Sequence, residues 1–318
     1  MKRLRSGIFF TLLLLLFFEI WIGFPIPIEM APPNRKALVD EAGEDNAQQK
    51  AKGVHLVETR EGHRDWELFS ELAESSQGMA AWQLQKVKVQ FYRDKIIEFV
   101  VTGQTGYFDS KTRDIKIEGN VRTITANGYV IDTDSIHFQA DRRILESPGL
   151  VRMKSPARKG LGPVSFKGEG LVAFVDSKEL EIRKNVEALH PMKDQNPMRV
   201  NAQKAFFKTI DSSVRFEGAV KVSNGTKQIE GPKALFLYAD AAERLQSVKM
   251  DGGVQMKDSN RYATSDSVRF DPEVNSYILS GSPRVVQDLD EILGEEITLL
   301  EGGRKIKVDR IKARVEQD

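Results

Sequence analysis

The 318-residue sequence contains no cysteine, and this absence removes several classes of site. Disulfide frameworks, thiolate metal centres and cysteine nucleophiles all need a thiol. The sequence has only four histidines, and they are scattered without the regular spacing of metal ligands. The formal net charge is +1, so no basic field favours a nucleic-acid partner. We therefore expect no cofactor, no metal site and no nucleic-acid partner.

Catalytic sequence motifs are also missing. The sequence has no phosphate-binding Walker loop, no GxGxxG after a strand and no GxSxG elbow. Carboxylates do occur two residues apart, at Asp132 and Asp134 and at Asp288 and Asp290, and a carboxylate pair can hydrolyse glycosides. Because carboxylates recur at nearly every expected turn, solvated turn residues explain these pairs better. We predict that the protein is not an enzyme, and a β-helical polysaccharide hydrolase is the weakest alternative.

The N-terminus holds the longest apolar run of the sequence. Three basic residues among the first five precede it, and its roughly 17 residues are at the lower limit for crossing a ~30 Å hydrocarbon core. No convincing small-x-small cleavage site follows, which favours an anchor over a cleaved signal peptide. Because basic tails stay in the cytoplasm, we expect a cytoplasmic tail at 1–7, a transmembrane anchor at 8–28 and a polar spacer at 29–52. Glu19 interrupts the apolar run. Two explanations remain open: Glu19 contacts the transmembrane helix of a partner, or its side chain is neutralised or reaches the membrane interface.

Beyond the spacer, the sequence alternates in the manner of half-buried strands. In residues 214–222 (VRFEGAVKV) the large apolar side chains occupy even positions and the charged ones odd positions. A β-strand has a side-chain period of two, and Gly218 marks an expected kink. The equivalent positions of the other units are Gly119, Gly149, Lys184, Gly252 and Gly281. Their spacing of about thirty residues is typical of arrays in which each unit is buried by stacking on its neighbours.

We therefore predict an all-β fold of repeated antiparallel hairpins behind a single N-terminal transmembrane helix. Two leucine-rich segments, 67–76 and 291–300, look helical, but both are too short to change this fold class. A stretch rich in proline, glycine and basic residues at 156–163 is interpreted as a seam. It separates a first β domain, 53–155, from a second one, 164–318.

The first half of the sequence resembles LptC, the membrane-anchored bridge subunit of lipopolysaccharide transport. The segments that carry this resemblance are GVHLVE (53–58), DWELF (65–69), TGQTGYFD (102–109), IEGNV (117–121) and GYVIDTDSIHF (128–138). The second half resembles the soluble LptA/OstA bridge domain, through VNAQKAFF (200–207), FEGAVKV (216–222), YATSDSVRFDP (262–272) and LSGSPRVV (279–286). Each segment is degenerate, and the specificity comes from their number, their order and the anchor in front.

The resemblance implies a β-jelly roll, an open two-sheet clasp whose inward apolar row holds the acyl chains of lipopolysaccharide. It thereby implies a membrane-anchored periplasmic bridge that passes lipopolysaccharide from an inner-membrane ABC transporter toward the outer membrane. Further LptA-like or LptD-like jelly rolls would join by edge-strand addition. The alternative for most of the inward residues is plain core packing without any lipid contact. The implied groove residues are Phe91, Phe99, Ile117, Ile136, Phe138, Phe207, Phe216, Phe236, Met250, Phe270 and Leu279.

A basic cluster is a candidate for headgroup contacts. It consists of Arg152, Lys154, Arg158 and Lys159, which suit anionic headgroups or a phosphorylated glycolipid, although a solvated loop explains them as well. The implied location is the bacterial inner membrane, with one span, a cytoplasmic N-terminus and most of the chain in the periplasm. The alternative function is an anchored β-solenoid scaffold that binds cell-wall polymer or envelope proteins.

Overall fold

The computed structural model describes residues 48–76, 80–157, 162–192, 196–239, 244–288 and 290–310. These residues belong to one compact unit, Asn46–Asp318. The expected cytoplasmic tail and anchor, together with most of the spacer, lie outside the described residues, as do Arg158 and Lys159. In the part of the chain that is described, no helix is long and apolar enough to cross a membrane.

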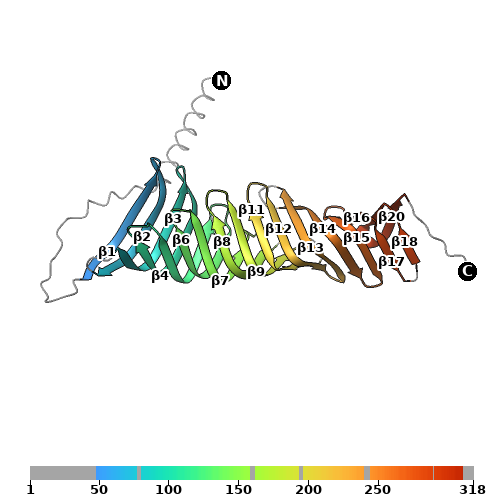
Figure 1. The fold of residues 1–318 in the computed structure, drawn as a ribbon, viewed down its shortest axis with the longest axis horizontal. Coiled ribbons are helices and arrows are strands. Elements are labelled where there is room, and N and C mark those ends of the chain that lie inside the picture. Colours follow the sequence, from blue (N-terminus) through green and yellow to red (C-terminus); the bar gives the residue numbers. More distant parts are fainter. Residues whose placement is uncertain are drawn as a thin grey trace, which may run out of the picture. The chain divides into compact units, whose positions relative to one another are not determined.

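The described residues form one antiparallel sheet of 20 strands (Figure 1). Its strands and single 3-10 turn are β1 (Gln48–Arg60), β2 (His63–Ser76), β3 (Ala81–Arg93), β4 (Ile96–Asp109), β5 (Ile115–Thr125), β6 (Val130–Gln139), β7 (Ile144–Lys154), β8 (Ser165–Phe174), β9 (Glu179–His190), β10 (Met198–Ala202), β11 (Lys204–Lys208), β12 (Ser213–Asn224), β13 (Lys227–Ala239), β14 (Arg244–Asp258), β15 (Arg261–Asp271), β16 (Ser276–Ser280), β17 (Arg284–Gln287), β18 (Asp290–Leu293), β19 (Glu296–Leu300), η1 (Glu301–Gly303) and β20 (Lys305–Asp309).

The strands follow the chain as a meander from β1 to β15 (Figure 1). Beyond β15 the sheet divides, because β15 pairs with both β16 and β17; β16 leads on to β19 and β20, and β17 leads on to β18. Each long strand pairs with the next one, and the short strands β10 and β11 together lie between β9 and β12. The sheet continues from β7 into β8 across the expected seam. One sheet therefore runs through both halves of the sequence.

The all-β prediction is confirmed, and it extends to the two segments that look helical. Residues 67–76 lie inside β2, where Leu68 is fully buried between β1 and β3. Residues 291–300 fall in β18 and β19, where Ile297 and Leu299 are buried on alternate positions. Strand pairing supplies backbone hydrogen bonds to both segments, whereas an isolated helix of about ten residues is only marginally stable.

A column of β-bulges crosses the sheet near the glycine positions of the repeat. In β12 the register with β13 shifts between Glu217 and Val220, and Gly218 has a φ of +81°. Gly119 in β5 and Gly252 in β14 lie in equivalent shifts, with φ values of +79° and +97°. Glycine adopts such angles without the steric cost of a Cβ, so the predicted kink at Gly218 is confirmed as a bulge.

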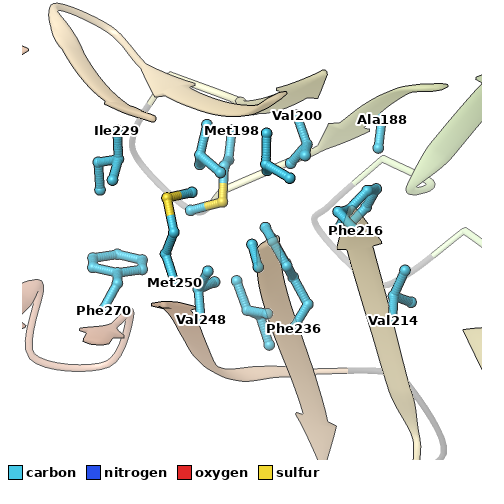
Figure 2. Close-up of a cluster of buried hydrophobic side chains, with 14 of the residues drawn as sticks. Ala188, Met198, Val200, Val214, Phe216, Ile229, Phe236, Val248, Met250 and Phe270 are labelled. Carbon is cyan, nitrogen blue, oxygen red and sulfur yellow. The ribbon is translucent and has the colours of Figure 1, made fainter. Parts of the chain in front are cut away.

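The sheet folds over along this column of bulges. Ile229 and Phe236 both belong to β13, yet they point into the core from opposite layers (Figure 2). Between them, the register of β13 with β12 and β14 shifts at Gly231 and Pro232. Each long strand therefore contributes one half to each layer, and the inward side chains of both halves form the core.

Folding over brings the two turn-bearing margins of the sheet together. We call them rim 1, with turns at 61–62, 94–95, 126–129, 225–226 and 259–260, and rim 2, with turns at 110–114, 140–143, 175–178, 209–212 and 272–275. At rim 1, Arg93 Nη2 donates a hydrogen bond to the Val175 carbonyl of rim 2 over 2.9 Å. A rim 2 residue, Arg113, lies 3.5 Å from Glu58, near the rim 1 end of β1.

Candidate functional site

The structure brings all eleven implied groove residues to the inward side of the sheet. They belong to two apolar clusters or pack against them, and ten are buried, whereas Phe207 is half-buried. Each sits on a strand whose burial alternates along the chain, as a side-chain period of two requires. The row is closed around Phe138 and Phe216, which are each only 1% exposed.

The first cluster is built by strands β2 to β7. Its centre is Phe91, whose ring stacks on Phe99 at 4.5 Å and meets Phe138 edge-on at 4.8 Å. Ile117 and Ile136 are paired residues of the adjacent strands β5 and β6. Aromatic pairs at such distances contribute about 0.5–1.5 kcal/mol beyond the burial of their area.

The second cluster continues the row through the later strands. Phe216 meets Phe236 edge-on at 5.1 Å, and Phe166 meets Phe207 edge-on at 4.9 Å. Figure 2 shows Phe236, Met250 and neighbouring side chains of one layer pointing toward the opposite layer. The inward row is therefore made of aromatic and flexible apolar side chains, a composition suited to irregular apolar surfaces.

Two of the four headgroup candidates can be placed, and they lie away from the row. Arg152 and Lys154 are exposed and alternate on β7 with the buried Val151 and Met153. Alternation puts them on the outward face. The structure therefore does not bring Arg152 and Lys154 together with the inward groove residues.

The carboxylate pairs lie at the surface in polar contacts. Asp132 accepts a 2.7 Å hydrogen bond from Nε of Arg122, and Asp288 accepts one of 3.4 Å from Asn260. Asp134 and Asp290 are exposed. Among the residues that the structure describes, no group of three or more histidine or acidic side chains is arranged to hold a metal ion.

A buried arginine joins the rims, and sequence reasoning missed it. Arg143, in a turn of rim 2, is 8% exposed and forms ion pairs with Asp65 of rim 1 and with Asp176 at 2.6 Å. Burial opposes the charge, but the hydrogen bonds to Asp176 and Asp65 outweigh it and raise the pKa of Arg143. Its only sequence signal is a basic residue at a turn, which is common on any surface.

Sequence reasoning also missed three glycines that lie beneath inward side chains of the next strand. A Cβ on Gly168 would collide with Cγ2 of Ile182 and come within 3.0 Å of the Lys184 carbonyl oxygen. The other close approaches are Gly103 beneath Ile117 and Gly231 beneath Met250. These glycines recur beside the bulges. Searching each repeat of the sequence for a second glycine would therefore have found them.

Two adjoining hollows open between the rims near the middle of the sheet. Their volumes are about 440 and 210 Å³. The residues that line both hollows are Thr125, Asn127, Ile131, Leu180 and Thr209. The larger hollow contacts groove residues Phe99 and Ile136, and the smaller one contacts Phe207. The row is thus accessible from the side at this point.

Comparisons with known proteins identify two regions. Residues 12–190 match the family profile "Lipopolysaccharide-assembly, LptC-related". Residues 199–301 match the profile "LptA/(LptD N-terminal domain) LPS transport protein". No curated protein matches. A crystal structure of LptH, the LptA homologous periplasmic component of the lipopolysaccharide transport device of Pseudomonas aeruginosa, matches at 18% identity and a TM-score of 0.33. That match covers 39% of this chain and 90% of LptH.

The two matched regions lie in the order that the sequence resemblance predicts. The LptC-related profile covers more than half of the chain and includes β1 to β9. The second profile begins in β10, which pairs with β9 in the same sheet. The chain therefore belongs to the LptC-related lipopolysaccharide-assembly family and continues, within one sheet, into an LptA-like region.

Proposed function

We propose that this protein is a membrane-anchored periplasmic bridge that holds the acyl chains of lipopolysaccharide against its inward apolar row. It receives the lipid from an inner-membrane ABC transporter and passes it toward the outer membrane. Both matched families belong to lipopolysaccharide transport, which supports a bridging role. We propose that the fold is a β-jelly roll that opens as a clasp. Its two layers are hinged at the bulges, and its two rims face each other.

The continuous inward row is the observation that carries this proposal. It consists of two apolar clusters, one around Phe91 in the LptC-related region and one that reaches Leu279 in the LptA-like region, and Ala173 packs against both. Burying a methylene yields roughly 0.8 kcal/mol, so lipid chains need a continuous apolar surface to cross an aqueous compartment. One sheet without an internal break offers such a surface.

The closed row requires a physical route for opening. The side chains of Arg93, Arg113 and Arg143 join the rims, whereas backbone ladders hold each layer. Parting the rims breaks a few ion pairs and exposes apolar surface, but it leaves the ladders intact. An entering acyl chain then covers the apolar surface that opening exposes.

The ends of the sheet suit the proposed partners. Among the described strands, β1 pairs only with β2 at one end of the sheet, and at the other end β18 pairs only with β17 and β20 only with β19. Each therefore has a free edge that can accept a strand. We propose the inner-membrane transporter at the first edge and an LptA-like or LptD-like jelly roll at the last. The apolar run at 8–28 would anchor the chain, with its N-terminus in the cytoplasm.

Photo-crosslinking in cells tests the proposal. A benzophenone amino acid at Phe138 or Phe216 should trap lipopolysaccharide, because both side chains lie in the row. The control is Tyr107, which is 42% exposed and alternates with the buried Phe108 on β4. Equal adducts at all three positions, or none at Phe138 and Phe216, would contradict the proposal. The second of these results would favour the alternative of an anchored scaffold.

A further inference from the structure

Exposed apolar side chains border the larger hollow on both rims. Ile96 and Ile97, directly after the 94–95 turn of rim 1, are 72% and 37% exposed. Phe174, beside the 175–178 turn of rim 2, is 39% exposed and also lines the hollow. Ile210, next to the lining residue Thr209, is 71% exposed. We call these four residues the lip. Grouped exposed apolar side chains mark surfaces that meet another apolar body.

The floor of the hollow is apolar and joins the two core clusters. Phe99, Ile136 and Leu145 come from the first cluster, and Ile131 and Leu171 from the second. The larger hollow has a volume of about 440 Å³, within the range of about 300–1,000 Å³ typical of ligand pockets. A flexible chain that entered between the lip residues would reach the inward row directly.

Two polar atoms in the wall of the hollow have no partner. Thr123 is 5% exposed, and its Oγ1 makes no hydrogen bond. Glu98 binds Arg93 through Oε1 at 2.9 Å, but its buried Oε2 is unsatisfied. Leaving such buried atoms unpaired destabilises the folded protein. A head group with O–H or N–H donors would satisfy the free oxygen of Glu98, and an acceptor oxygen on the same head would pair with the Thr123 hydroxyl.

We propose that the hollow is a side-entry site that admits one acyl chain of an amphiphile into the row between the rims. The hydrogen-bonding head of the amphiphile stays between Glu98 and Thr123. This inference rests on the bridging function proposed above and adds to it a lateral point of entry, distinct from either end of the sheet. A protein partner would also cover the exposed lip, but it would not fill the apolar hollow or reach Thr123.

Crosslinking at the lip separates this inference from the bridging function. A benzophenone amino acid replaces Ile97 or Phe174 in the full-length chain in cells, and Val274 serves as control. Val274 is a 60% exposed apolar residue of a rim 2 turn that does not line the hollow. We expect glycolipid adducts at Ile97 and Phe174 at least fivefold above those at Val274. Adducts at Phe216 but not at the lip would overturn side entry and leave the bridge intact.

The other outcomes are equally decisive. The absence of glycolipid adducts at Phe216 and at the lip alike would overturn the bridging function itself. Adducts at the lip that contain only protein would identify a docking surface and overturn the lipid site. Adducts at the lip without any at Phe216 would support side entry but reject passage along the row.

A conservative substitution tests the head-binding atoms with a soluble probe. Because the chain has no cysteine, Ile97→Cys supplies a single thiol for a fluorescent label that reports binding. Thr123→Val should weaken the binding of N-dodecanoylglucosamine about tenfold and leave methyl dodecanoate, which has no donor, unchanged. Its melting temperature should not fall, since the lost hydroxyl is unpaired.

Thr133→Val is the matched control. Thr133 is also 5% exposed, but its hydroxyl donates a 3.2 Å hydrogen bond to the Ser135 carbonyl and it does not line the hollow. Thr133→Val should therefore lower the melting temperature without changing either affinity. Equal affinities of Thr123→Val and the unsubstituted chain for N-dodecanoylglucosamine would overturn the assignment of the head site.

Discussion

Replacing Arg143 with methionine removes the cation that joins the two rims, and its cost can be worked out from the burial of its partners. The side chain of Asp65 is 13% exposed and that of Asp176 is 67% exposed. Asp176 is solvated, so its ion pair contributes at most about 1 kcal/mol. Asp65 is left as a largely buried carboxylate, and breaking a buried pair costs about 3–5 kcal/mol. We therefore expect a loss of about 3 kcal/mol.

Hydrogen exchange and urea denaturation of the full-length protein measure this loss. Exchange reports local opening, so amides near 63–66 and 141–145 should exchange faster in Arg143→Met. Arg122→Met is the control, because Arg122 and Asp132 form an ion pair at 2.7 Å with side chains 57% and 39% exposed. That control should lose clearly less stability than Arg143→Met, because exposed ion pairs contribute little.

A second substitution tests the cause. Asp65→Asn added to Arg143→Met removes the uncompensated charge and should restore at least half of the lost stability, as a coupled pair requires. If Arg143→Met loses no more stability than Arg122→Met, or Asp65→Asn restores nothing, the reasoning about a buried rim contact is refuted.

The remaining predictions concern the bulges, acid stability and the row. Gly168→Ala should cost about 1–3 kcal/mol in thermal denaturation, because its Cβ overlaps Ile182. Gly149→Ala, whose Cβ meets only Asp134 Oδ2 at 3.8 Å, should be neutral or slightly stabilising; equal losses would contradict this. Burial raises the pKa of Asp258. The hydrogen bonds that it accepts from Thr226 and the Ser259 amide lower the pKa by more than burial raises it, so the net pKa lies below the usual 3.8. Its stabilisation is therefore present above about pH 4 and is lost as the pH falls through the lower, folded pKa, so Asp258→Asn should flatten the decline of urea midpoints below pH 4. An unchanged slope would argue against it. Phe216→Asp places an unpaired charge in the row and should weaken lipopolysaccharide transport in cells, measured on the outer membrane; normal transport in a stably folded variant would be the contrary result.

Local periodicity made much of the fold predictable. Val214, Phe216, Val220 and Val222 are all buried, as their even positions predict. Gly218 lies in a bulge, as its place between two apolar pairs predicts. These features depend on neighbours in sequence and on adjacent strands, and the side-chain period records both.

The exact residue that bends each strand was less predictable. Gly149 has no positive φ, and the left-handed residue near it is Gly170 on the paired strand β8. At the Lys184 position the left-handed residue is Asn185, with a φ of +53°, a conformation that asparagine tolerates. A bulge can lie on either strand of a pair, and it can lie one residue after the position that the repeat predicts. The position of a glycine in the sequence therefore does not locate the bulge by itself.

Contacts between the rims leave almost no trace in the sequence. Arg143 and Asp65 are 78 residues apart, and Arg93 lies 82 residues from Val175. Their proximity depends on how far the sheet twists as it folds over, a property of many strands together. The lip was missed for the same reason, because Ile97 and Phe174 become neighbours of one hollow only after both rims are in place.

The pairing of β9 with β10 fixes the ratio of the LptC-related region to the LptA-like region at one to one. Two regions that match separate families share a covalent chain and a hydrogen-bond ladder at this point. A junction between separate proteins is occupied according to their concentrations, whereas a junction within one chain forms at a high effective concentration that dilution does not change. In the proposed bridge, association equilibria and competition from other edge strands then concern the free edges of the described strands, which are β1 at one end and β18 and β20 at the other.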